Sequence, residues 1–231
     1  MRILLTRPEP DGLRSAARLR ARGHDVILAP LMRAETLQAD FDGPFAAVLM
    51  TSANAARAAV DHPRFHELSS LPLLTVGDHS AEVARAAGFA EVVSAQGALD
   101  DLVRLAAARF ANARVLYLAG ENRAGDLAAE LAKRGITVET AVIYRAVAAT
   151  ALPPEAAQAL GTNQLDAVLH YSRRSAATLL QLAAAAGAVN TLLGLAHYCL
   201  SDEVAVPLRD AGARRIAIAP HPGESSLFGL F

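Results

Sequence analysis

The chain has little of several residue types that mark specialised proteins. It contains one cysteine, Cys199, which excludes an internal disulfide, and no tryptophan. Cys199 stands in an apolar stretch, where a small buried side chain is expected. No run of about 18 apolar residues suggests a membrane-spanning helix, and no charged leader with a long apolar segment opens the chain. The sequence therefore predicts a soluble, cytoplasmic protein.

Charge of one sign is also lacking. The net charge is −1, only 19% of the residues are charged, and no basic run or zinc-finger spacing is present. Bulk attraction to nucleic acid is therefore not expected. His62 and His66 have a spacing that could hold a metal ion on a helix, but Pro63 lies between them and no carboxylate or cysteine completes the set. We expect no metal site.

Three common catalytic motifs are absent as well. The chain has no G-x-S-x-G, G-x-x-x-x-G-K-[ST] or G-x-G-x-x-G sequence. Serine hydrolase, P-loop and standard dinucleotide-binding functions thereby lose their main support. A hydrophobic fraction of 53% nevertheless indicates a folded protein with a substantial core.

What the chain does have is an internal repeat. Residues 2–8 return as residues 114–120, and Gly23 returns as Gly135, in both cases 112 positions later. Residues 47–52 return as 167–172 with an offset of 120, and the stretches around Gly88 and Gly212 are related by an offset of 124. The repeat predicts two similar α/β units, and ligands often bind where two such units face each other.

The apolar pattern alternates between short strands and helices. We expect strands at residues 3–6, 25–31, 46–51, 73–76, 91–94, 114–118, 137–146, 167–171, 196–200 and 215–219. We expect helices at 13–22, 53–60, 80–87, 126–134, 175–185 and 204–211. This alternation predicts parallel sheets covered by helices on both faces. Residues 28–37 and 138–147 run on past the expected strand ends and could be long strands that join two domains.

Polar residues follow several of these strands, where open parallel sheets bind ligands. The candidates are Thr6, Arg7, Thr51, Ser52, Asn54, Gly77, Tyr171, Ser172 and Arg173. The hydroxyl and amide residues among them could be ordinary helix caps, or they could hold carboxylate or phosphate oxygens at helix N-termini. Arginines in these loops suit an anionic ligand or simply decorate the surface. Arg14, Arg18 and Arg22, by contrast, recur along one helix and predict a solvated face.

Tyr144 stands within one of the two overlong segments. Its ring could pack on a neighbouring strand. Its hydroxyl could instead overlook a cleft between the units and donate a proton or a hydrogen bond there.

In their order and spacing, these motifs resemble the uroporphyrinogen III synthase family. The motifs that carry the resemblance are Leu5-Thr6-Arg7-Pro8, Pro30-Leu31, Met50-Thr51-Ser52-Ala53-Asn54-Ala55, Val76-Gly77, Ile143-Tyr144-Arg145, the Ser172 turn and Ala219-Pro220. Each motif is short, but together with the duplication they cover essentially the whole chain.

The resemblance implies a cofactor-free enzyme that cyclises hydroxymethylbilane to uroporphyrinogen III, with inversion of ring D and loss of water. In the family mechanism the terminal hydroxyl leaves to give an azafulvene, and the far ring attacks through its substituted carbon to form a spiro intermediate, which fragments and recloses. By this analogy Tyr144 assists departure of the hydroxyl. Thr6, Arg7, Ser52, Asn54 and Ser172, with nearby residues, would bind the acetate and propionate side chains of the substrate.

The resemblance also implies the domain organisation. It predicts two similar parallel-sheet α/β domains, flavodoxin-like and doubly wound, joined by a two-stranded β-ladder. One domain would comprise residues 1–32 plus 149–231 and the other 38–140, with 33–37 and 141–148 as linker strands. The repeated units would exchange their leading βαβ portions.

Two departures from the family pattern keep other functions open. Ser201 and Val204 stand in a turn that commonly carries glycine and a hydroxyl residue, and Arg173-Arg174 replaces smaller residues. The alternatives are a non-catalytic two-domain ligand-binding protein or a family member that has lost activity. We expect a monomer without nucleic-acid or membrane partners, with porphobilinogen deaminase as a candidate transient partner.

Overall fold

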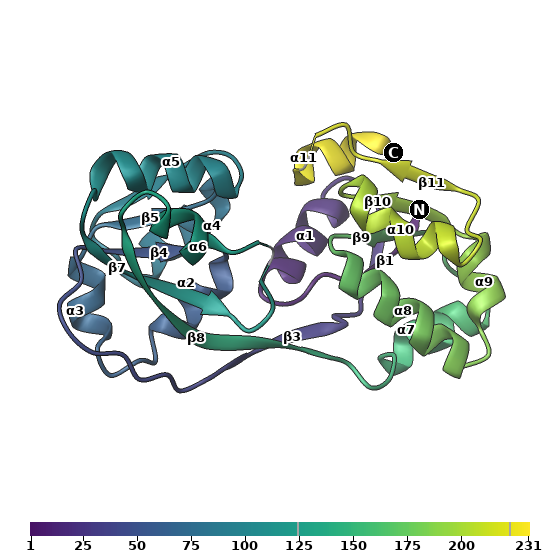
Figure 1. Ribbon diagram of the computed structural model, residues 1–231. Helices are drawn as coiled ribbons and strands as arrows, with labels where there is room; N and C mark the ends of the chain where they lie inside the picture. Colours follow the sequence, from purple (N-terminus) through teal and green to yellow (C-terminus); the bar gives the residue numbers. More distant parts are fainter. Residues whose placement is uncertain (124, 222) are drawn as a thin grey trace. The chain divides into compact units, whose positions relative to one another are not determined.

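The protein is represented by a computed structural model that describes residues 1–123, 125–221 and 223–231 (Figure 1). Its internal contacts divide the chain into two units. Unit 1 comprises Met1–Arg33 and Val147–Phe231, and unit 2 comprises Ala34–Ala146. The chain therefore passes between the units twice, once within strand β3 (Met32–Thr36) and once within strand β8 (Thr137–Ala148).

Unit 1 is built on a parallel sheet with the strand order β11-β10-β9-β1-β2. Its strands are β1 (Arg2–Leu5), β2 (Asp25–Leu28), β9 (Ala167–His170), β10 (Ala196–Cys199) and β11 (Ile216–Ile218). The central strands are apolar at consecutive positions because helices cover both faces of the sheet. Ile3, Leu4 and Leu5 are accordingly all fully buried.

The helices of unit 1 form a layer on each face. They are α1 (Asp11–Arg20), α7 (Pro154–Gly161), α8 (Arg173–Ala185), α9 (Val189–Gly194), α10 (Asp202–Asp210) and α11 (Glu224–Leu227), with a 3-10 helix at Phe228–Leu230. Leu19, Leu227 and Phe228 pack with Ile3 and Leu5 on one face. On the other face, helices α7, α8 and α9 contribute Leu160, Leu179 and Leu192 to the cluster that contains Leu4.

Unit 2 contains a sheet with the order β3-β8-β7-β4-β5-β6. Besides β3 and β8, its strands are β4 (Ala47–Met50), β5 (Leu73–Thr75), β6 (Val92–Ser94) and β7 (Arg114–Gly120). Helices α2 (Ala53–Ala59), α3 (Phe65–Ser70) and α4 (Asp78–Ala87) contribute to the core on one face. Helices α5 (Leu99–Arg109) and α6 (Leu127–Ala132) cover the other.

Strands β3 and β8 form a two-stranded ladder. The backbone N–H of Leu37 donates to the carbonyl of Ile143 at 2.8 Å, and the N–H of Ala149 donates to the carbonyl of Leu31 at 2.9 Å. Glu35 and Arg145 form an ion pair at 2.8 Å between the same strands. In each of these three pairs the two residue numbers have the same sum. Residues that face each other in antiparallel strands are related in this way, so β3 and β8 are antiparallel.

The predicted fold class is confirmed. In the part of the chain that the structure describes, each unit has five parallel strands in the same order, because β8-β7-β4-β5-β6 in unit 2 corresponds to β2-β1-β9-β10-β11 in unit 1. This is the flavodoxin-like order. The repeated sequences also interleave: the leading β-α-β of the first repeat joins the trailing strands of the second in unit 1, and the reverse holds in unit 2.

Several details differ from the sequence-based expectation. Helices α3, α5, α7 and α9 stand where the sequence pattern predicts none. The strand predicted at residues 25–31 ends early, at Leu28, and residues 28–37 do not form one long strand, because β3 begins only at Met32. Pro30 lies in this gap and has no N–H with which to continue a ladder, which gives the physical reason for the break. Among the residues that the structure describes, no helix is long and apolar enough to cross a membrane.

Candidate functional site at the sheet switch points

In each sheet, at one place, a pair of neighbouring parallel strands has connections that lead to opposite sides of the sheet. In unit 2 this place lies between β7, which continues through α6 to β8, and β4, which continues through α2 and α3 to β5. In unit 1 it lies between β1 and β9. Open α/β sheets bind ligands outside the carboxyl ends of strands at such switch points. We call these places the unit 1 and unit 2 switch points.

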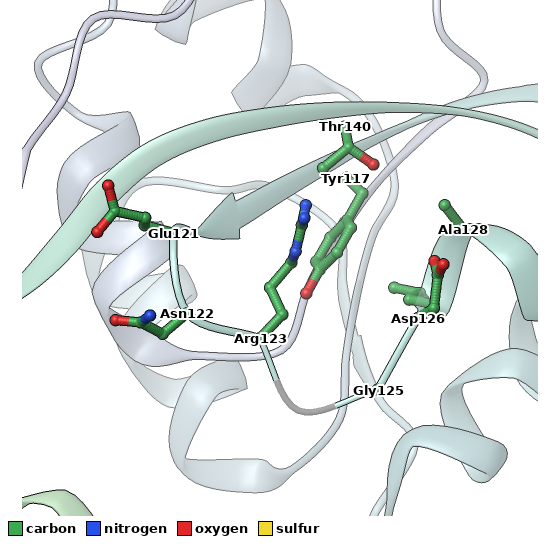
Figure 2. A pocket seen from close by; sticks show the side chains of 9 residues that line it. Tyr117, Glu121, Asn122, Arg123, Gly125, Asp126, Ala128 and Thr140 are labelled. Carbon is green, nitrogen blue, oxygen red and sulfur yellow. The ribbon is translucent and has the colours of Figure 1, made fainter.

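The unit 2 switch point is hollow. A cavity of about 320 Å³ is lined by Thr51, Ser52, Val76, Leu99, Gly120, Asn122, Arg123 and Tyr144. A second cavity, of about 650 Å³, also includes Asn122 and Arg123 in its lining, together with Tyr117, Glu121, Thr140 and the start of α6. Figure 2 shows the side chains of Arg123, Tyr117 and Thr140 converging on this second cavity. Hydroxyl groups and the guanidinium of Arg123 thus line both cavities.

Tyr144 is brought to the cavity by an irregularity in β8. Ala119 pairs with Val142, but the next residue of β7, Gly120, pairs with Tyr144. Ile143 is therefore an extra residue, and a bulge of this kind re-aims the side chains that follow it. The ring of Tyr144 lies directly against Gly120, where a Cβ atom would come within 2.5 Å of Cζ and 2.7 Å of the hydroxyl oxygen.

A second tyrosine of unit 2 lies close to the same place. The hydroxyl of Tyr117 forms a hydrogen bond of 2.9 Å with the hydroxyl of Thr51. Burial raises the pKa of Tyr117 above its usual value, and the hydrogen bond with Thr51 opposes this shift. Tyr117 therefore remains a neutral hydrogen-bonding group at physiological pH. It was not predicted from the sequence, where the available signal was a single tyrosine in the middle of an otherwise aliphatic run.

Ser52 combines two roles that the sequence leaves as alternatives. It is the N-cap of α2, and its Oγ accepts a hydrogen bond from the backbone N–H of Asn54 at 3.2 Å. It also lines the smaller cavity. The side-chain oxygen of Asn54 accepts a hydrogen bond from Arg57 at 2.9 Å. Gly77 is the N-cap residue of α4, and its carbonyl accepts from the Thr75 hydroxyl at 3.2 Å.

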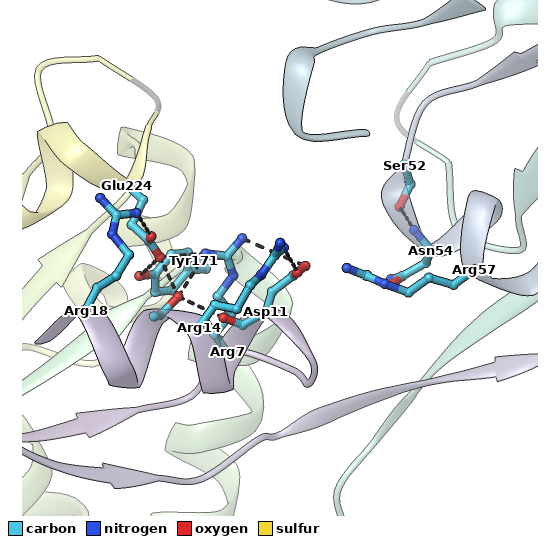
Figure 3. Close-up of polar contacts among 10 residues, drawn as sticks. Arg7, Asp11, Arg14, Arg18, Ser52, Asn54, Arg57, Tyr171 and Glu224 are labelled. Carbon is cyan, nitrogen blue, oxygen red and sulfur yellow. Dashed lines mark hydrogen bonds and ion pairs between the residues drawn. The ribbon is translucent and has the colours of Figure 1, made fainter. Parts of the chain in front are cut away.

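The unit 1 switch point is occupied by a side chain of the protein itself. The carboxylate of Glu224, from α11, accepts hydrogen bonds from Arg7 Nη1 at 2.6 Å and from the Tyr171 hydroxyl at 2.9 Å. It also contacts the Ser15 hydroxyl and the Arg18 guanidinium. Figure 3 shows Arg7, Arg18 and Tyr171 gathered around Glu224. The Arg7 guanidinium lies 4.5 Å from the centre of the Tyr171 ring.

The electrostatics of this cluster favour an ionised Glu224. Burial would raise the pKa of its carboxyl group, but hydrogen bonds from Ser15 and Tyr171 and the charges of Arg7 and Arg18 outweigh burial and lower it. Burial, followed by the negative charge of Glu224, raises the pKa of Tyr171. The cluster therefore consists of an anion surrounded by donors that keep their protons.

The remaining predicted residues of unit 1 have structural contacts. Thr6 is fully buried, and its hydroxyl donates to the carbonyl of Leu169 at 3.1 Å, which fastens β1 to β9. Ser172 caps α8 by accepting a hydrogen bond from the N–H of Ser175 at 3.1 Å. Arg173 is exposed in the first turn of that helix.

The structure thus brings two sets of predicted residues together. Thr51, Ser52 and Tyr144 share the unit 2 cavity, and Arg7 and Tyr171 share the Glu224 cluster. Glu224 and Ser15 were not predicted from the sequence, and no local signal could have found Glu224, because its partners lie between 53 and 217 residues away in the chain.

The prediction that Arg14, Arg18 and Arg22 lie on a solvated face is confirmed, because all three are exposed, but each also has a partner within unit 1. Arg14 pairs with Asp11, Arg18 pairs with Glu224, and Arg22 donates to the carbonyl of Phe228 at 3.0 Å. The guanidinium groups of Arg18 and Arg22 each lie 5.2 Å from the centre of the Phe228 ring. The C-terminal segment packs over α1 and supplies the partners of Arg18 and Arg22, whereas the partner of Arg14 lies within α1.

Groups that could bind metal or act as nucleophiles elsewhere have other roles. Within the described residues, no cluster of three or more potential metal ligands occurs. His62 uses both ring nitrogens, one with the carbonyl of Ala39 at 2.9 Å and one with the N–H of Arg64 at 3.1 Å. Cys199 is buried, and burial raises the pKa of its thiol to about 12.

The fold and these switch points define a class: a two-unit, doubly wound α/β protein with proton donors and anion-binding groups at the carboxyl ends of its strands. Comparison with solved structures agrees. A uroporphyrinogen-III synthetase from Helicobacter pylori has a TM-score of 0.70 at 18% identity, covering 100% of this chain and 98% of that one. A mutant uroporphyrinogen III synthase from the extremely thermophilic bacterium Thermus thermophilus has a TM-score of 0.53 at 17% identity, covering 100% and 97%. No curated protein sequence matches the chain.

The sequence comparison gives the family. The model described as uroporphyrinogen-III synthase HemD matches residues 14–229, and the chain therefore belongs to that family. The chain is a lyase of haem biosynthesis that cyclises hydroxymethylbilane. The enzyme interpretation of the sequence is thereby confirmed over the non-catalytic alternative.

Proposed function

We propose that the chain converts hydroxymethylbilane to uroporphyrinogen III with inversion of ring D and loss of water, and that Tyr144 assists departure of the terminal hydroxyl group. The observation that carries the role of Tyr144 is its place in the unit 2 cavity, where it lies against Gly120 beside Thr51 and Ser52. A cavity at a switch point supports a binding function. A phenol in its wall supports proton donation.

The reaction needs modest chemistry and precise placement. As the C–O bond of the hydroxymethyl group breaks, its electron pair leaves with oxygen, and a proton from Tyr144 completes the departing water. The pyrrole that loses the group stabilises the resulting positive charge by delocalisation. Because the electron-rich rings supply this stabilisation, the main contribution of the protein is to hold the chain in the conformation that leads to the inverted ring.

The substrate-binding groups that we propose are Thr6, Arg7, Thr51, Ser52, Asn54, Gly77, Tyr171, Ser172 and Arg173, through side chains or neighbouring backbone N–H groups. Support is strongest for Thr51 and Ser52, which line the cavity with Tyr144. Thr6 would act through its backbone surroundings, since its hydroxyl is buried and bound to Leu169. Arg7 would need to share its guanidinium between Glu224 and a substrate carboxylate.

We also propose that the two units are separate domains, with residues 1–32 plus 149–231 in one, 38–140 in the other, and 33–37 and 141–148 as linker strands. The division of internal contacts at positions 33/34 and 146/147 supports this proposal. We further propose a cytoplasmic monomer without cofactor or metal, supplied with its substrate by transient contact with porphobilinogen deaminase.

The deciding experiment follows the isomer that forms. Porphobilinogen and porphobilinogen deaminase generate hydroxymethylbilane in the assay, the protein is added, and the oxidised products are separated by chromatography. We expect the type III isomer to dominate. If the uninverted isomer alone accumulates, at the rate of a control without the protein, the proposed reaction is excluded.

A further inference from the structure

We infer that Gly120 is a positioning residue for catalysis, whose missing side chain creates the place in which the Tyr144 ring lies. This inference rests on the proposed role of Tyr144 and names a second residue of the same cavity that sets the position of its hydroxyl. Both residues line the cavity at the unit 2 switch point, one from the end of β7 and the other from β8.

With the Tyr144 ring in its observed place, position 120 has room only for the hydrogen of glycine. A Cβ atom there would lie 2.5 Å from Cζ, 2.7 Å from the hydroxyl oxygen and 2.9 Å from Cε2 of Tyr144. These three atoms form the reactive end of the tyrosine. The glycine therefore determines where the hydroxyl can lie.

The backbone itself does not require glycine. Gly120 is a buried strand residue and is not among the residues with positive φ. Alanine can therefore adopt its conformation without strain. The three nearest atoms that a new methyl group would meet all belong to the far end of Tyr144, which can rotate away. A methyl group at this position should displace the hydroxyl and leave the fold intact.

The register of the sheet supports a specific arrangement. The bulge at Ile143 places Tyr144 opposite Gly120, and the N–H of Glu121 then donates to the carbonyl of Tyr144 at 2.9 Å. The backbone of Tyr144 is thus held on β7 immediately after the glycine. With the backbone fixed, a displaced ring can move only by changing its side-chain torsion angles, which takes the hydroxyl off its place in the cavity wall.

The first experiment compares Gly120→Ala with wild type in steady-state kinetics. We expect kcat to fall by about 10- to 100-fold, the cost of misplacing a catalytic group by about 1 Å, while KM changes less than about threefold. Gly161→Ala is the matched control, because Gly161 ends α7 in unit 1 and a Cβ there would meet no atom within 4 Å. The control should keep wild-type kinetics. A rise in KM with an unchanged kcat for Gly120→Ala would overturn the inference, since it would indicate obstruction of the substrate.

A double-mutant cycle tests whether Gly120 acts through Tyr144. In a Tyr144→Phe background the catalytic hydroxyl is already gone, so Gly120→Ala should cause little further loss of kcat. If the two losses multiply, Gly120 acts independently and the inference fails. If Tyr144→Phe alone keeps near-normal turnover, the proposed role of Tyr144 fails first, and that result is separate from the cycle.

A structural readout distinguishes displacement from general damage. The four tyrosines can be labelled with ¹³C at Cζ, and the Tyr144 resonance is assigned by its loss in Tyr144→Phe. In Gly120→Ala we expect a shift of that resonance and unchanged signals from Tyr171 and Tyr198 in unit 1. An unmoved Tyr144 signal contradicts the inference. Should Gly120→Ala fold poorly, Gly120→Ala/Tyr144→Ala must recover the melting temperature of Tyr144→Ala; failure to recover it would show that the methyl group clashes elsewhere.

Discussion

The two switch points occupy equivalent places in two sheets of the same strand order, yet one is filled and charged while the other is hollow and carries hydroxyl groups. In unit 1, Tyr171 follows β9 and donates to Glu224. In unit 2 the repeat places Thr51 after β4, where it binds the hydroxyl of Tyr117 and borders a cavity. The two units therefore share one strand order but carry different side chains at the ends of equivalent strands.

The two sheets also differ in the polarity of their buried residues. His170 and His197 are fully buried in unit 1 and joined by a hydrogen bond of 3.0 Å, and His197 also contacts the carbonyl of Leu192 at 3.1 Å. The strand pairing places Met50 and Leu73 at the corresponding positions in unit 2, also fully buried. A polar pair in one core therefore corresponds to an apolar pair in the other. The cost of the polar pair should appear when the pH falls.

The largest effect is expected from Tyr144→Phe. Loss of the hydroxyl removes the proposed proton donor, and general acid assistance commonly contributes about 100-fold or more to turnover. We expect kcat to fall by at least that factor with an unchanged circular dichroism spectrum. Tyr198→Phe serves as the control, because Tyr198 packs against Phe231 in unit 1, with ring centres 4.6 Å apart. Turnover near wild type in Tyr144→Phe would reduce Tyr144 to a packing residue and remove the functional difference between the switch points.

The buried histidine pair should make unit 1 sensitive to acid. Burial lowers the pKa of His197 to about 4 and lowers that of His170 well below its usual value. The unfolded chain, with an ordinary histidine pKa near 6.5, binds more protons below that pH, so stability falls as the pH drops from about 6.5 towards 4. For His197 the loss is about 3 kcal/mol, from 1.36 kcal/mol per pKa unit.

The matched variant His170→Met/His197→Leu copies the pair found in unit 2. It should remove most of this acid sensitivity when urea unfolding of the protein is measured between pH 7 and pH 4.5. A double variant with the same pH profile as wild type would show that other groups carry the acid response.

The sequence predicted elements whose signal is local. The apolar runs at 3–6 and 114–118 identified β1 and β7, and the repeat pointed to equivalent loops after them. The sequence could not show which of two neighbouring residues at a strand end points into the core. Thr6 points inward and binds Leu169, whereas Arg7 reaches Glu224. That distinction depends on tertiary contacts. The bulge at Ile143 was equally hidden, because a strand of apolar residues looks the same with or without one extra residue.

A smaller effect is expected from Glu224→Gln, which tests whether charge holds the unit 1 switch point together. The glutamine keeps the shape but gives Arg7 and Arg18 a neutral partner, and weakening a partly buried ion pair in this way should cost about 2 kcal/mol. The lowered pKa of Glu224 means that its contribution is present above the ordinary glutamate pKa near 4.3 and is lost as the pH falls through the folded value. Thermal unfolding at pH 7 measures the loss. Equal stability of wild type and variant would mean that the cluster is held by packing of Leu227 and Phe228 instead.

The smallest effect is expected from Tyr117→Phe, which removes the hydroxyl pair that unit 2 has where unit 1 has its ion pairs. A neutral hydrogen bond of this kind contributes about 1 kcal/mol, and the ring of Tyr117 would stay packed in its apolar cluster. Thr51→Val removes the other partner, and the double variant should cost less than the two single losses together, because both break the same bond. Strict additivity in urea unfolding would show that the two hydroxyls act separately. In that case no energetic coupling between the two hydroxyls would stabilise the unit 2 switch point. The difference from unit 1, where Glu224 binds its neighbours through charge, would then be larger.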